Sequence, residues 1–142
     1  MTVYVDSSFL ASLYVIDVHA PIARQRMGSR PAVGVTPFNR AEFAHALYRQ
    51  VFRASMTTSE AGLAWSDFEQ DCARGVWTTV NPPERVWETG IGLARRFVPT
   101  LGVRTLDSLH VACALELRVE RFWTFDDRQA KLAEAVGLDT KA

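Results

Sequence analysis

Cysteine is scarce in this sequence: Cys72 and Cys113 are the only two among 142 residues, and neither belongs to a C-x-x-C pair. We therefore expect both to be small buried apolar residues, as most free cysteines are. Long hydrophobic runs are also missing, and so is an N-terminal basic segment followed by an apolar one. The sequence thus predicts a cytoplasmic protein without a membrane span or a secretory signal.

Net charge is absent as well, because 16 basic residues balance 16 acidic ones. The chain as a whole therefore exerts no field that would attract nucleic acid. Lysine is nearly absent from the basic set, since only Lys131 and Lys141 are lysines and the rest are arginines. A guanidinium group suits bidentate phosphate contacts, although a GC-rich genome explains the same bias more simply.

Two familiar site motifs are missing. The sequence contains no glycine-rich phosphate loop, and its three histidines, His19, His45 and His110, show neither HxxxH nor HExxH spacing. We expect His110 to be a packed or hydrogen-bonded structural residue. The chain also lacks internal repeats and linker-like segments, and 48% of its residues are hydrophobic. These features predict one domain, residues 1–142, with a core of its own.

Short β-rich segments alternate with segments of helical periodicity. We predict strands at residues 2–5, 32–36, 77–80 and 121–125, and a possible short edge strand at 138–139. Helices are predicted at 7–14, 17–27, 38–53, 59–73, 84–97, 105–117 and from 127 to about 136. This alternation predicts an α/β protein with a mainly parallel sheet.

Four acidic residues occupy matching places in this pattern. Asp6 follows the first strand and Asp126 the fourth, while Glu42 lies early in one helix. Asp107 lies in the first turn of an almost wholly apolar helix, for which Thr105 is the expected N-cap. In a parallel sheet, strand ends and the helix starts that follow them share one edge. We therefore expect the four side chains to converge, although Glu42 alone is interpreted more simply as a solvated acid.

Converging carboxylates repel one another unless protons or a cation compensate their charge. Mg²⁺ binds a few carboxylates together with water, and a metal held in this way can activate water for attack at phosphorus. Ser8 can hydrogen-bond the carboxylate of Asp6 or Asp126. The same serine can instead cap the first helix, and the two roles are compatible.

Four segments resemble, in order and spacing, the acidic motifs of the PIN-domain ribonucleases. They are Val5-Asp6-Ser7-Ser8-Phe9-Leu10, Arg40-Ala41-Glu42-Phe43, Arg104-Thr105-Leu106-Asp107-Ser108-Leu109-His110 and Thr124-Phe125-Asp126-Asp127-Arg128. Each motif is short, but four in order are specific, and together they extend over essentially the whole chain. The sequence is most similar to the VapC-like toxins of bacterial toxin–antitoxin pairs.

The resemblance implies a three-layer α/β/α sandwich with a central parallel sheet, and RNA cleavage that depends on Mg²⁺ or Mn²⁺. The metal-binding and catalytic acids would be Asp6, Glu42, Asp107 and Asp126, with Ser8 in support. Asp127 doubles the fourth acid, and we favour Asp126 because it follows the strand directly. A PIN fold without catalysis, serving as an RNA- or partner-binding module, is one alternative. A phospho-acceptor receiver domain is another, although it would need an early acidic pair and a late lysine that are missing.

The resemblance also implies a homodimer and a cognate antitoxin protein as partners. Apolar residues are dense in two helical regions, and we expect part of them to form an exposed interface: Phe9, Leu10, Leu13, Tyr14, Val15, Ile16, Phe38, Tyr48 and Phe52. The alternative is that the helix near residues 59–74, with Trp65 and Phe68, covers them. Arg40 and Arg104 are candidates for contacts with RNA phosphates.

Overall fold

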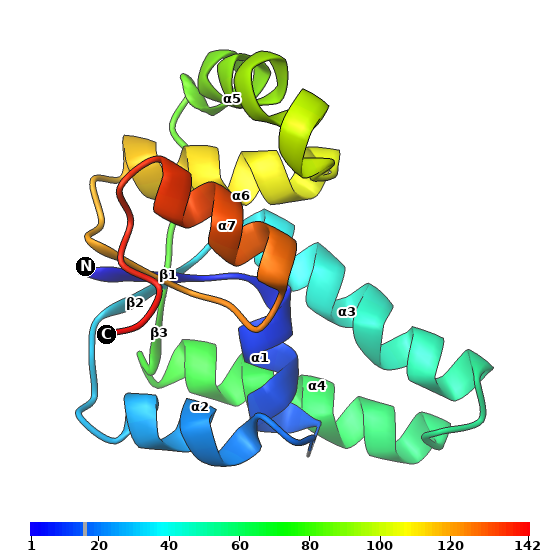
Figure 1. Ribbon diagram of the computed structural model, residues 1–142. Coiled ribbons are helices and arrows are strands. Elements are labelled where there is room, and N and C mark those ends of the chain that lie inside the picture. The colour runs from blue at the N-terminus through cyan, green and yellow to red at the C-terminus, as the bar shows by residue number, and fades with distance from the viewer. Residues whose placement is uncertain (16) are drawn as a thin grey trace.

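Four three-residue strands form a parallel sheet in the computed structural model, which describes residues 1–15 and 17–142 (Figure 1). They are β1 (Val3–Val5), β2 (Val33–Val35), β3 (Trp77–Thr79) and β4 (Arg121–Trp123). Their order across the sheet is β3-β2-β1-β4, and every neighbouring pair is parallel. All four strands lie within the predicted segments. Residues 138–139 form no strand, and Asp139 makes only an isolated bridge to Arg121.

Helices cover both faces of this sheet, so the predicted three-layer sandwich is confirmed (Figure 1). One face packs against α1 (Ser7–Tyr14), α2 (Ala20–Met27), α3 (Pro37–Phe52) and α4 (Thr58–Ala73). The other packs against α5 (Val86–Leu101), α6 (Thr105–Glu116) and α7 (Asp127–Ala135). Consecutive strand residues alternate between the two cores. Trp123 belongs to the first core, whereas Tyr4 and Phe122 stack on each other in the second.

Several helix ends differ from the predicted ones, among them the start of α2, at Ala20 instead of residue 17, and two of the differences have a clear local cause. The N-cap of α6 is Arg104 rather than Thr105, because the backbone N–H of Arg104 bonds to Asp107 and closes the first turn. Helix α5 continues past the predicted end at residue 97, with Pro99 inside its last turns. It ends at Gly102, whose φ of 63° is a conformation that glycine adopts without strain.

The expected apolar surface is only partly present. Phe9 and Leu10 are fully buried, so they are not part of an exposed interface. Helix α4 covers part of this apolar region, as the alternative interpretation expected, because its Phe68 packs edge-on against Tyr14 and Phe43. Leu13 and Val15 pack against the same core and Phe38 against the opposite one, and Ile16 lies outside the described residues. Tyr48 and Phe52 of α3 remain 46% and 91% exposed.

The two cysteines stay separate. Cys113 is buried in α6 and Cys72 is half-buried in α4, and both are free thiols. Within residues 1–15 and 17–142, we find no helix with the length and apolar character needed to cross a membrane.

Candidate active site

The carboxyl ends of β1, β2 and β4 lie at one edge of the sheet, and a helix begins within a few residues of the end of each strand (Figure 1). Asp6, Thr36 and Asp126 are the N-caps of α1, α3 and α7. Polar side chains are needed here because the first N–H groups of a helix lack partners within the helix. The chain therefore places acids and hydroxyls at the edge where parallel sheets bind ligands.

Asp6 lies at the centre of this edge and is only 5% exposed. Its Oδ1 accepts hydrogen bonds from Ser8 Oγ at 2.6 Å and from the Phe9 N–H at 3.1 Å, and its Oδ2 accepts one from Thr124 Oγ1. Asp6 thus caps α1 while Ser8 supports the carboxylate. Burial raises the pKa of Asp6, and the bonds from Ser8 and Thr124 oppose this shift. A bound cation would favour the charged form of this carboxylate.

Asp126 is joined to Asp6 through Thr124. The backbone N–H of Asp126 donates to Thr124 Oγ1 at 2.9 Å, and that hydroxyl donates to Asp6. Oδ1 of Asp126 caps α7 by accepting from the Gln129 N–H at 2.9 Å. Asp126 is half-buried and Asp127 is exposed, and both line a depression of about 390 Å³ together with Arg104.

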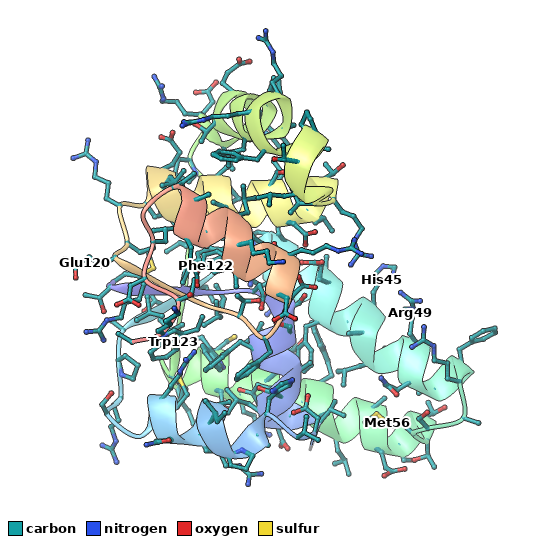
Figure 2. The ribbon with its side chains drawn as sticks, viewed as in Figure 1. His45, Arg49, Met56, Glu120, Phe122 and Trp123 are labelled. Atoms are coloured by element: carbon teal, nitrogen blue, oxygen red, sulfur yellow. The ribbon has the colours of Figure 1, made fainter. Side chains whose placement is uncertain are left out.

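Asp107 and Glu42 line a neighbouring groove of about 620 Å³. Oδ2 of Asp107 accepts from the Arg104 N–H at 2.9 Å, and the Asp107 side chain is 16% exposed. Glu42 is 25% exposed and contacts the imidazole of His110. His45 and Arg49, on the same helix as Glu42, also line this groove, and Figure 2 shows both side chains projecting from α3.

Three of the four predicted acids therefore border two depressions that share Arg104: Asp126 lines one, and Glu42 and Asp107 line the other. The buried Asp6 lines neither, and it is linked to Asp126 through Thr124. Across the described ranges 1–15 and 17–142, no three side chains of the His, Cys, Asp and Glu types stand together as a complete ligand set. Mg²⁺ keeps several waters and uses one or two protein carboxylates, so it needs no such set. The buried carboxylate of Asp6 and the half-buried Asp126, linked through Thr124, are oxygen donors of the kind that a hard divalent cation prefers.

Of the two arginines considered for phosphate contacts, Arg104 alone lies at these depressions. Arg40 faces α4, where its guanidinium is 3.7 Å from Glu69 and 5.3 Å from the centre of the Trp65 ring. It lines a different depression, at the carboxyl ends of β2 and β3. The expectation that Arg40 serves this site is therefore wrong.

The sequence predicted the hydrogen bond between Ser8 and Asp6, but it missed other partners of the acids. Thr124 holds Asp6, and His110 contacts Glu42 while its other nitrogen faces Tyr4. Because β4 ends at Trp123 and not at the predicted residue 125, Thr124 rather than Asp126 directly follows the strand, as Asp6 follows β1. No sequence pattern pointed to Tyr4 as a partner of His110, because aromatic residues are common in buried strands.

The sequence matches the PIN domain family over residues 3–135. This chain belongs to the PIN domain family. Membership excludes the receiver-domain alternative. A search of curated proteins found no similar sequence.

Two solved structures share this PIN fold. The VapC20 toxin of Mycobacterium tuberculosis, described as cleaving the sarcin–ricin loop, has a TM-score of 0.72 and 18% identity, with 96% of each chain covered. A toxin–antitoxin complex from Klebsiella pneumoniae has a TM-score of 0.62 and 16% identity, covering 99% of this chain and 97% of that one. At these identities the likeness shows the fold, and it confirms the predicted architecture over the full length.

Proposed function

We propose that this PIN domain is a metal-dependent endoribonuclease and the toxin of a toxin–antitoxin pair. The observation that carries the proposal is the buried carboxylate of Asp6, which Ser8 and Thr124 hold at the sheet edge and which Thr124 links to Asp126. Burying a carboxylate costs free energy unless its charge is compensated. A protein that keeps one linked to an acid lining an open depression is suited to binding a cation there.

Asp6, Asp107 and Asp126 would hold Mg²⁺ or Mn²⁺, with Glu42 as a further ligand or as the residue that orients the attacking water. When bound, such a metal supplies a nucleophile by lowering the pKa of water, and it stabilises charge at phosphorus. Arg104 lies between the two depressions, where its guanidinium would contact an RNA phosphate. The substrate we propose is RNA, hydrolysed at a phosphodiester.

The cognate antitoxin would inhibit this site by electrostatics. An arginine or lysine directed at the acids pairs with carboxylates and competes with the metal for them. The Klebsiella relative was solved together with its antitoxin, which supports a partner of this kind here. We also propose a cytoplasmic homodimer, with the exposed Tyr48 and Phe52 of α3 at a protein–protein contact.

The test is RNA cleavage by the purified protein in Mn²⁺ and in EDTA, with Asp6→Asn as the inactive variant and Asp67→Asn as the control. Asp67 is an exposed acid of α4, away from the site. We expect internal cuts with Mn²⁺, none in EDTA, and none with Asp6→Asn. Metal-independent cleavage, or equal activity of both variants, would refute the proposal. Binding of RNA without any cleavage would favour the alternative of a non-catalytic binding module.

A further inference from the structure

His110 connects three separate elements of the site. It lies on α6, is 1% exposed, and directs Nε2 to Oε1 of Glu42 on α3. Its other ring nitrogen, Nδ1, is 2.7 Å from the hydroxyl of Tyr4 on β1. The imidazole therefore lies between a residue of the groove and the central strand of the sheet.

The chemistry of these groups sets the direction of the hydrogen bonds. An ionised carboxylate only accepts, so Nε2 of His110 carries the hydrogen that faces Glu42. In a neutral imidazole Nδ1 then accepts, and the Tyr4 hydroxyl donates to it. Burial raises the pKa of Tyr4 well above its ordinary value of 10.0, so the phenol keeps its proton.

The Tyr4 hydroxyl has no better acceptor among its described contacts. Its distances to Asn39 Oδ1 and Thr36 Oγ1 are 3.2 and 3.3 Å, longer than the distance to His110. Asn39 Oδ1 also accepts from the backbone and hydroxyl of Thr36, at 2.8 and 2.9 Å. The Asn39 amide donates to the carbonyl of Val5 at 2.6 Å, which fixes this group against β1.

We propose that His110, oriented by Tyr4, is a positioning residue that holds one carboxylate oxygen of Glu42 so that the other is available to a metal or its water. This inference rests on the proposed function, because it assigns Glu42 a task at the metal. Groups behind metal ligands commonly fix ligand orientation through such hydrogen bonds. Without His110, the Glu42 side chain would lose the contact that restricts its rotamers.

Four variants distinguish a histidine that positions Glu42 from one that only stabilises the fold. His110→Leu removes the donor but keeps an apolar side chain, whereas His110→Gln restores an amide N–H near the place of Nε2. Tyr4→Phe removes only the hydroxyl that orients the ring. Tyr14→Phe is the control, because the hydroxyl of the half-buried Tyr14 donates to Asp71 at 2.5 Å and accepts from Trp77 Nε1 at 2.7 Å, on the opposite face of the sheet.

The measurements are Mn²⁺ affinity by calorimetry, and kcat and KM with an RNA substrate. We expect His110→Leu to lower Mn²⁺ affinity and kcat about ten- to a hundred-fold with little change in KM. His110→Gln recovers most of this loss, and Tyr4→Phe shifts both quantities in the same direction as His110→Leu. Tyr14→Phe lowers the melting temperature alone.

Nitrogen NMR of the metal-free protein adds a readout that does not need activity. The wild type should show the Nε2–H tautomer of His110, and Tyr4→Phe should weaken that preference. Unchanged Mn²⁺ affinity in both His110→Leu and Tyr4→Phe would overturn the positioning role. If His110→Leu does not fold, the comparison of Tyr4→Phe with Tyr14→Phe decides. A wild type that binds no Mn²⁺ and cleaves no RNA would instead refute the proposed function.

Discussion

Asp107→Asn should abolish the stabilisation of this protein by metal while leaving the fold intact. Asp107 closes the first turn of α6 by accepting the Arg104 N–H at 2.9 Å, and the amide oxygen of asparagine can accept the same bond. Its ion pair with the exposed Arg104 guanidinium is long, at 3.9 Å, and contributes at most about 1 kcal/mol. The metal-free variant should therefore unfold close to the wild-type temperature.

The expected size of the metal effect follows from linkage. A ligand that binds only the folded state at a hundred times its Kd stabilises that state by about 2.7 kcal/mol. For a chain of 142 residues, 1 kcal/mol corresponds to roughly 3–4 °C in melting temperature. Saturating Mn²⁺ should thus raise the wild-type Tm by about 8–11 °C, and Asp107→Asn should lose most of this increase.

The assay is thermal unfolding followed by circular dichroism in EDTA and in millimolar Mn²⁺. Glu60→Gln is a matched control, because Glu60 closes the first turn of α4 as Asp107 does that of α6, accepting the Thr57 N–H at 3.0 Å. Glu60 lies on a helix outside the two depressions, so this variant should retain the full metal shift. Equal shifts in Asp107→Asn and wild type would show that the ion binds elsewhere.

Three other variants test separate parts of the molecule. Asp6→Asn should raise the unfolding free energy of the metal-free protein by on the order of 1 kcal/mol at neutral pH, since it removes a buried charge and asparagine is an equally good N-cap. Because burial raises the folded-state pKa of Asp6, the stability gained by Asp6→Asn over the wild type should shrink as the pH falls, and it should vanish below the ordinary aspartate pKa of 3.8. Urea titrations of both proteins at several pH values would detect this trend. Phe52→Asp should weaken self-association or antitoxin binding in sedimentation experiments without changing the rise in melting temperature caused by Mn²⁺. A wild type that is strictly monomeric and binds no antitoxin would contradict the interface. Phe68→Ala should cost about 3–5 kcal/mol of stability in denaturant titrations while any remaining folded protein still binds Mn²⁺, because its cluster with Tyr14 and Phe43 lies in the core and not at the site.

The sheet and its helices were predictable because the relevant signals are local. Runs such as Val3–Val5 are short, β-branched and stop at a polar residue, so both the strand and the position of Asp6 follow from neighbouring residues. The order of the strands places acids from distant segments at one edge, and parallel topology predicts this without knowledge of side-chain contacts. The placement of Asp6 and Asp126 at this edge was therefore within reach of the sequence, whereas the convergence of all four acids on a metal stays a proposal.

Details that depend on tertiary packing were not predictable. The full burial of Phe9 did not follow from its hydrophobic stripe, because its ring packs against Trp123 and Phe125, which are distant in the sequence. Arg40 was placed wrongly because the direction of a helix face depends on which neighbour it packs against, here Glu69 and Trp65. The contact between His110 and Tyr4 joins residues 106 positions apart, and nothing local marks either as a partner.

The hydrogen bond from Thr124 to Asp6 joins residues that are 118 positions apart, and this separation determines when the site can form during synthesis. Chains emerge from the ribosome with the N-terminal segment first. A nascent chain therefore exposes Asp6 long before β4, Thr124 and Asp126 exist to complete the edge around it. If the site cleaves RNA as proposed, the ribosome and messenger that produce this protein are shielded from it until residues 121–126 have been synthesised and have left the ribosome.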